Sequence, residues 1–211
     1  MMMVMEMSEL EKMSQGKLYD DAGDPSLSKA RDKAHSLAFR YNQLDELHKE
    51  ERAEILKELL PNLGEDSFLT GPIYFDYGFN FHTGARFYAN FHFVCLDVCE
   101  IDIGDDVYCG PNVSINTPLH PLLAEERNQY MSEHGMTDKE YGKKIVIGSN
   151  CWLASNVTIC AGAHIGNDCV IGAGSVVVGN IPNGYLAYGV PAKPIRKITK
   201  EDSVYLKKDL F

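Results

Sequence analysis

A six-residue period runs through the C-terminal half of the chain and restricts its fold more than any other feature. From Ile147 the segment IGSNCWLASNVTICAGAHIGNDCVIGAGSVVVGNIP divides into six consecutive hexads, each beginning with a branched aliphatic residue. These first-place residues are Ile147, Leu153, Ile159, Ile165, Ile171 and Val177. A helix would repeat its apolar face every three to four residues, and a hairpin strand would alternate over a longer run. The period therefore indicates a solenoid of very short strands.

The fourth place of each hexad predicts a tight corner between strands. It holds residues that tolerate left-handed backbone angles, namely Asn150, Asn156, Gly162, Asp168, Gly174 and Asn180. The fifth places carry residues that are smaller on the whole, namely Cys151, Val157, Ala163, Cys169, Ser175 and Ile181. Three hexads make one triangular coil, and successive coils stack at about 4.8 Å. We therefore expect a mainly β chain, a parallel β-helix whose first-place residues fill the interior.

The same pattern occurs earlier in the chain. IGDDVYCGPNVS, from Ile103, repeats it with Asp106 and Asn112 at the corners, and TGARFY, from Thr83, repeats it more faintly and two residues out of phase. A single hexad of this kind is typical of a turn after a strand, but many copies in phase indicate a solenoid. We interpret the slip within LDVCE, residues 96–100, as one irregular corner.

The N-terminal quarter follows a helical rather than a six-residue period. Between residues 10 and 60 the apolar side chains recur at helical spacing, and they include Ala30, Ala34, Leu37, Ala38, Tyr41, Ile55, Leu56, Leu59 and Leu60. Asp24-Pro25 predicts a helix start and Pro61 a helix end. We therefore expect a helical cap over residues 1–62, a β-helix domain over 63–198 with an excursion loop at 116–145, and a tail over 199–211.

Composition excludes several classes of partner. The chain has 20 basic and 30 acidic residues, a net charge of −10, which disfavours nucleic acid and anionic membranes. No apolar run approaches the ~18 residues of a membrane span, and the first residues lack the basic region of a secretory signal. The six cysteines form no C-x-x-C pair, which favours buried thiols in a reducing compartment. We expect a cytoplasmic protein with no nucleic-acid or membrane partner.

The excursion NTPLHPLLAEERNQYMSEHGMTDKEYGKK, residues 116–144, interrupts the count of six and obeys no period. A loop longer than ~15 residues without repeats is usually functional or disordered. Near its start stands His120, between Leu119 and Pro121. Imidazole is the side chain whose unperturbed pKa lies near neutrality, so a histidine here could remove a proton from a hydroxyl group. The alternative for His120 is a solvated or buried ring with no role in catalysis. For His134, in the same excursion, a solvated ring is the better interpretation.

Several motifs together resemble the maltose and galactoside O-acetyltransferase family of hexapeptide-repeat acyltransferases. They are GKLYD, YFDYGFN, FYANFHFVCLDVC, NTPLHP, EYGKKIVIGSNCWL, IGAGSVV and YGVPAKPIRKI. The resemblance implies a left-handed parallel β-helix that assembles as a homotrimer. It also implies transfer of acetyl from acetyl-CoA to a hydroxyl of a sugar or similar small acceptor. His120 matches the family's catalytic base, so the hydroxyl would attack the thioester directly.

The resemblance places four residues near the acceptor. They are Asp21, Asp76, Asn90 and Asp97. Asp76 is serine in galactoside-type relatives, which favours the maltose type. Asp97 has a second interpretation, in which its carboxylate bonds the irregular corner. Asp20 and Asp21 are adjacent, and the motif leaves open which of the two faces the acceptor.

Six residues match positions that bind coenzyme A in the family. They are Ser155, Ala173, Val178, Gly179, Lys193 and Arg196. The backbone at Ser155 and Ala173 would face the pantetheine arm, and an amide there could hold the thioester oxygen as it gains charge. Val178-Gly179 stands where many relatives have Thr-Lys, so one cation is missing. Lys193 and Arg196 remain as phosphate partners, with Lys193 in place of a commoner arginine.

Other functions stay open on sequence alone. A xenobiotic or serine-type acetyltransferase of the same superfamily would share the fold and differ in what lies opposite His120. A non-catalytic or metal-binding β-helix protein is the alternative outside acyl transfer. A zinc site of that kind would need two or three histidines on adjacent coils, and no histidine spacing here repeats in multiples of the coil. We therefore expect no metal.

Overall fold

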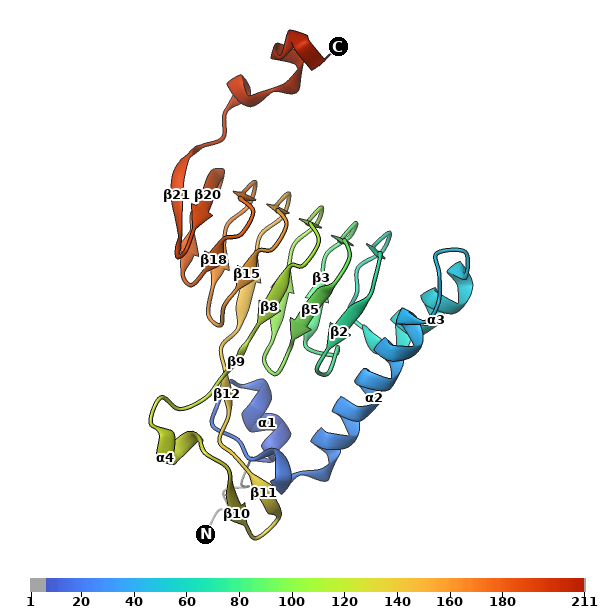
Figure 1. Cartoon of the computed structure of the whole chain (residues 1–211), viewed down its shortest axis with the longest axis vertical. Coiled ribbons are helices and arrows are strands. Elements are labelled where there is room, and N and C mark those ends of the chain that lie inside the picture. The colour runs from blue at the N-terminus through green and yellow to red at the C-terminus, as the bar shows by residue number, and fades with distance from the viewer. Residues whose placement is uncertain (1–6, 211) are drawn as a thin grey trace, which may run out of the picture.

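The computed structural model of the chain describes residues 7–210. Its N-terminal part is helical and lies beside one end of a β-helix (Figure 1). The helices are α1 (Glu9–Ser14), the short 3-10 helix η1 (Asp21–Gly23), α2 (Pro25–Asn42) and α3 (Lys49–Leu59). The Asp24 side chain accepts a hydrogen bond from Ser26 N, and Pro25 opens α2, as predicted.

A buried arginine fastens this helical cap to the first coil. Arg52 of α3 is buried and donates from Nη2 to the Tyr41 hydroxyl, to Leu69 O at 2.8 Å and to Thr70 O at 2.7 Å. Its guanidinium also lies over the Tyr41 ring, 4.4 Å from the centroid. The cap and the solenoid therefore share one continuous core.

Three parallel sheets form the sides of a triangular prism, and the chain visits them in turn (Figure 1). Sheet 1 contains β1 (Phe68–Leu69), β4 (Tyr88–Ala89), β7 (Tyr108–Cys109), β14 (Trp152–Leu153), β17 (Val170–Ile171), β20 (Tyr185–Gly189) and β21 (Ala192–Lys197). Sheet 2 contains β2 (Ile73–Phe75), β5 (Phe93–Leu96), β8 (Ser114–Asn116), β15 (Thr158–Ile159) and β18 (Val176–Val177). Sheet 3 contains β3 (Phe81–Thr83), β6 (Ile101–Ile103), β13 (Ile145–Ile147), β16 (His164–Ile165) and β19 (Asn180–Ile181). Only β20 and β21 pair antiparallel among these strands.

The first-place aliphatic residues point into the prism, which confirms the predicted register. Ile147 pairs with Ile103 on one side and Ile165 on the other, and the six predicted first-place residues are all buried. The predicted fifth-place residues are buried as well. Like side chains therefore stack on like from coil to coil, so each short strand contributes to a continuous apolar column.

The predicted corners are present with one exception. Residues with positive φ stand at five of the six predicted places, with values between 58° at Asp168 and 79° at Gly162. Asn180 is the exception, because it lies in β19 and pairs with His164. The reason is that the last coil is two residues shorter than the one before it. Ile147 pairs with Ile165, eighteen residues further along, but Ile165 pairs with Ile181, only sixteen residues further along. The strand β19 therefore begins where a corner was predicted.

Two irregular corners, rather than the one predicted, lengthen the first coils. Ile73 pairs with Phe93, and Cys95 with Ile115, each twenty residues further along. The predicted slip at residues 96–100 is one of these corners, and a second occupies residues 76–80. Both lie between sheet 2 and sheet 3, and the excursion leaves β8 and returns to β13 at this same edge. We call it the excursion edge, comprising residues 76–80, 96–100, 117–144, 160–163 and 178–179.

The excursion has secondary structure of its own. It contains β9 (Pro118–Leu119), α4 (Ala124–Arg127), β10 (Tyr130–Ser132), β11 (Gly135–Thr137) and β12 (Tyr141–Gly142). β12 pairs antiparallel with β9, and β10 with β11. The loop lies against α1 and η1 (Figure 1), where Tyr19 N donates to Glu140 O at 3.0 Å. The excursion and the cap thus hold each other in place.

After β21 the chain continues as three short 3-10 helices, η2 (Lys200–Asp202), η3 (Val204–Leu206) and η4 (Lys208–Leu210). They extend away from the prism (Figure 1). Among the described residues, no helix combines the length and the apolar character needed to cross a bilayer.

The inward column predicts a large cost for truncating one of its members. We expect Ile159→Ala to lower the free energy of unfolding by roughly 2–5 kcal/mol, because the removed side chain leaves a cavity in a fully buried layer. His164→Ala, exposed on the outer face of β16 in sheet 3, is the control and should change it by about 0.5 kcal/mol or less. Urea denaturation of both variants measures the difference. Equal losses in the two variants would contradict the register.

Candidate active site

His120 lies at the excursion edge, directly after β9. The β9–β12 ladder fixes its backbone, and its side chain is 43% exposed. Its Nδ1 lies 3.1 Å from Lys139 O. Because a carbonyl oxygen can only accept, this bond places the proton of the neutral ring on Nδ1 and leaves the lone pair on Nε2. His120 is therefore oriented to take a proton at Nε2.

Two carboxylates flank the His120 ring. Glu140 Oε1 lies 3.8 Å from Nε2, and Asp138 Oδ2 lies 3.9 Å from Nδ1. Burial raises the pKa of Glu140, and the Tyr19 hydroxyl donates to its Oε2. Glu140 stands inside the EYGKK motif but was not predicted as a site residue, because its approach to His120 depends on the β9–β12 pairing rather than on spacing.

Asp76 lies at the same edge, at the end of β2. Its Oδ1 lies 3.9 Å from His35 Nε2 of α2, and burial raises its pKa. A cavity of about 530 Å³ opens beside it between α2 and sheet 2. Its walls include Phe39, Asn42 and Tyr74. An acid, an amide and aromatic faces are suited to a small polyhydroxylated ligand.

The structure separates the roles of Asp20 and Asp21. Asp20 caps η1 by accepting from Ala22 N at 3.0 Å, and it also accepts from the Thr137 hydroxyl of the excursion. Asp21 instead forms an ion pair with Arg31 of α2, at 3.1 Å. Asp21 is thus the residue whose charge faces the neighbouring helix. Arg31 is a further charged neighbour that the sequence analysis did not identify.

Tyr77 is surrounded by the acidic residues of this edge. Burial raises its pKa to about 12; the positive charge of Arg31 acts against this shift, and the negative charges of Asp76, Glu140 and Asp21 add to it. The fold therefore brings Asp21, Asp76 and the Glu140–His120 pair around one side chain, although they come from three separate segments. We call this group the excursion-edge cluster: Asp21, Arg31, His35, Asp76, Tyr77, His120 and Glu140.

Asp97 lies beneath this cluster and is 0% exposed. Its carboxylate accepts from Tyr77 N at 2.9 Å and Asn80 N at 3.2 Å, and Asn80 Nδ2 donates to its carbonyl at 2.8 Å. Burial raises its pKa to about 7. These contacts support the corner-bonding interpretation of Asp97, in which it positions the backbone that follows Asp76 and does not line the cavity.

A second candidate site lies at a different edge, between sheet 1 and sheet 2. Here Ser155 and Ala173 line a groove of about 610 Å³ together with Asn90 and Trp152. A Cβ on Gly110 would lie 2.8 Å from Ser155 N, so glycine is needed for the close approach of these two coils. We call this the groove edge, comprising residues 90–92, 110–112, 154–156 and 172–174. Trp152, to which the sequence analysis assigned no chemistry, stands exposed beside the groove.

The predicted site residues thus divide between two edges. Asn90 lies at the groove edge with Ser155 and Ala173, away from the other predicted acceptor residues. Val178 and Gly179 follow β18 and lie at the excursion edge, away from Ser155 and Ala173. Sheet 2 spans the distance between the two edges.

Lys193 and Arg196 both lie on β21. Lys193 is exposed at the position paired with Tyr188. Arg196 forms a two-pronged ion pair with Asp202, through Nη1–Oδ2 at 2.8 Å and Nη2–Oδ1 at 2.6 Å. This pairing holds the pKa of Asp202 down to about 2. Arg196 would have to leave Asp202 to bind a phosphate group.

Comparison with known families and proteins shows which family the chain belongs to. Residues 12–64 match the maltose acetyltransferase hexapeptide capping motif, and residues 144–179 match six repeats of the bacterial transferase hexapeptide. The chain is 36% identical to the galactoside O-acetyltransferase of Escherichia coli (strain K12) over 97% of both chains. It is 39% identical to a putative acetyltransferase of Saccharomyces cerevisiae over 93% of this chain and 96% of that protein.

Two solved structures of acetyltransferases are similar to this chain over most of its length. A maltose O-acetyltransferase from Clostridium difficile 630 superposes with a TM-score of 0.83 and 40% identity, covering 92% of this chain and 99% of that one. A galactoside acetyltransferase in complex with coenzyme A superposes with a TM-score of 0.84 and 36% identity, covering 93% and 94% of the two chains.

Asp97 makes the stability of the fold depend on pH. Its pKa is raised from 3.8 to about 7 by burial, so ionisation costs the folded state more than the unfolded state. Its contribution to stability is therefore full below about pH 4, declines as the pH rises, and levels off above about pH 7. We expect the difference in unfolding free energy between the wild type and Asp97→Asn to fall by roughly 1 kcal/mol per pH unit in this window. Urea denaturation across the window measures it, and a constant difference would contradict this account of Asp97.

Proposed function

Because the chain belongs to the maltose and galactoside O-acetyltransferase family of hexapeptide-repeat acyltransferases, it is an acetyltransferase, and we propose that it moves acetyl from acetyl-CoA to a hydroxyl group of a sugar. The observation that carries this proposal is the orientation of His120. Its Nδ1 is occupied by Lys139 O, and its Nε2 faces the excursion-edge cluster.

In the proposed reaction His120 is the general base. Nε2 takes the proton of the acceptor hydroxyl as its oxygen attacks the thioester carbon. The C–O bond forms, the C–S bond breaks, and the leaving thiolate receives the proton from the imidazolium. Asp138 and Glu140, both within 3.9 Å of the ring, stabilise the imidazolium that forms between these steps.

The excursion-edge cluster provides the proposed acceptor site. The carboxylates of Asp21 and Asp76 can accept hydrogen bonds from sugar hydroxyl groups, and Arg31 can donate. Phe39 and Tyr74, which line the cavity beside Asp76, offer apolar faces for a sugar ring. We favour a maltose-type acceptor because position 76 carries aspartate.

The groove edge provides the proposed donor site. The solved relative with coenzyme A supports this donor class. The groove, about 610 Å³, has the volume for part of a pantetheine arm, and Ser155 and Ala173 are among the residues that line it. An amide at this wall could hold the thioester oxygen as it gains charge. Lys193 and Arg196, both exposed on β21, are the proposed phosphate partners.

We further propose that the chain forms a homotrimer in which each active site is completed by a neighbouring subunit. One chain cannot bring His120 to its own groove, because sheet 2 separates the two edges. In a homotrimer with sheet 2 facing the axis, the excursion edge of one subunit lies beside the groove edge of the next. The outer side chains of sheet 2 favour such packing, since Val94, Ser114, Thr158 and Val176 are small and half-buried.

A cytoplasmic location fits these proposals. The six cysteines are free thiols, and five of them are buried. Burial raises the pKa of the Cys95 and Cys109 thiols, so they behave as apolar core residues rather than reactive groups.

Removing the His120 ring should affect rate and little else. We expect His120→Ala to lower kcat by about 10² to 10⁴, the usual contribution of a positioned general base. The side chain lies outside the prism core, so folding and coenzyme A affinity should stay unchanged. His134→Ala, in the same excursion, is the control. Steady-state kinetics that leave kcat within a few fold of the wild type would eliminate His120 as the base.

The shared site predicts complementation between two inactive variants. His120→Ala damages the excursion edge, and Ala173→Trp blocks the exposed groove edge. Refolding an equal mixture should restore about a quarter of wild-type activity, because random trimers contain interfaces that pair two intact edges. Each variant alone should remain inactive and trimeric by light scattering. Trimeric mixtures with no recovery would show that the site lies within one chain.

A further inference from the structure

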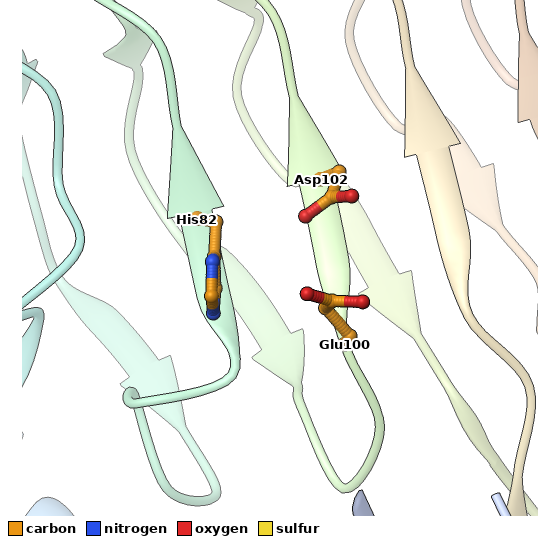
Figure 2. A group of neighbouring side chains, drawn as sticks. All are labelled: His82, Glu100 and Asp102. Atoms are coloured by element: carbon orange, nitrogen blue, oxygen red, sulfur yellow. The ribbon is translucent and has the colours of Figure 1, made fainter. Parts of the chain in front are cut away.

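Three side chains of types that can ligate a metal ion lie together on the outer face of sheet 3, next to the excursion edge and away from the groove edge. Figure 2 shows His82 on β3 with Glu100 and Asp102 on the neighbouring coil. His82 and Asp102 are direct cross-strand partners, and Glu100 stands two residues before Asp102 on the same face. One ligand atom from each lies within 4.8 Å of the others. We propose that these three residues bind a divalent transition-metal ion of the zinc type.

The chemistry of the three ligands selects this class of ion. One imidazole nitrogen and two carboxylate oxygens suit Zn²⁺, Co²⁺ and Ni²⁺, whereas Mg²⁺ and Ca²⁺ prefer oxygen ligands alone. A site with one histidine and two acids was not predicted from the sequence, because only sets of histidines on adjacent coils were expected to bind zinc. The pairing of β3 with β6 is what brings them together.

Lys144 also contacts both acids and sets the strength of the site. Its Nζ lies 2.7 Å from Glu100 Oε2 and 2.5 Å from Asp102 Oδ2. These two contacts use Glu100 Oε2 and Asp102 Oδ2, and neither involves Glu100 Oε1 or Asp102 Oδ1. Lys144 therefore uses one oxygen of each carboxylate and leaves the other for a metal ion. Its positive charge should weaken binding without preventing it.

The geometry needs only a small side-chain adjustment. A tetrahedral ion with bonds of about 2.0–2.2 Å requires ligand atoms about 3.4 Å apart, so atoms that now lie within 4.8 Å of one another must approach by up to about 1.4 Å. All three side chains are only partly buried and can rotate, while the paired strands keep their Cα atoms fixed. His82 Nε2 lies 3.4 Å from Asn62 Nδ2, a weak contact that a metal bond at this nitrogen would replace.

The expected effect of the ion is to join two coils. It would link β3 to β6 where the first irregular corners end, and Lys144 would tie the end of the excursion to the same acids. An ion that binds only the folded chain raises the melting temperature. This inference does not depend on acetyl transfer, because it is tested by binding alone.

The test is calorimetric titration of the full chain with ZnCl₂, together with the absorption spectrum of the Co²⁺ complex. We expect one site per chain whose affinity falls at least about tenfold in His82→Gln and in Asp102→Asn, since each removes one of three ligands. His164→Gln is the matched control, because His164 is exposed on the same sheet without an acid group of this kind. Lys144→Met should bind at least about tenfold more tightly than the wild type.

Two outcomes would overturn the proposal. Zinc affinity that is equal in the wild type, His82→Gln and Asp102→Asn would place the ion elsewhere. A loss of binding in His164→Gln would do the same. Circular dichroism of each variant shows whether it is folded, and Asp102→Asn, which keeps the side-chain shape, decides the result if His82→Gln does not fold.

Discussion

The register between coils is the constraint on which the rest of the structure depends. Each strand has only a few residues, and its inward side chain must stack on the same position of the next coil. A coil can therefore take extra residues only at a corner. Here the extra residues collect at one edge, at 76–80, 96–100 and the excursion. Departures from the repeat produce the irregular backbone from which a binding site can be built.

The excursion edge shows how such departures gather the residues of the proposed site. Asp97 is buried to hold the backbone of one corner, the β9–β12 ladder holds His120, and the Tyr19–Glu140 contact joins the helical cap to the excursion. The cap then contributes Asp21, Arg31 and His35 to the same cluster. The prism thus fixes where the cluster lies, and the helical cap and the excursion contribute most of its charged side chains.

Local periodicity explains why the sequence predicted the prism well and the site only in part. The hexads predict inward residues, most corners and the break at the excursion, because those features depend on neighbours along the chain. Glu140, Arg31 and His35 were missed because their proximity to His120 and Asp76 arises from packing of the cap against one edge. The sequence also did not predict that Asn90 lies apart from Asp76, or Val178 apart from Ser155, because that depends on which edge of the prism each corner occupies. Asn180 was misplaced because the final coil is shorter.

The central claim is that the active site is divided between two edges and completed by a neighbouring subunit. A crystal structure of the protein with coenzyme A bound tests it most directly. The account predicts that the pantetheine arm contacts Ser155 and Ala173 of one subunit while its sulfur points at His120 of the next. A thiol enclosed by His120 and Ser155 of the same chain would contradict it.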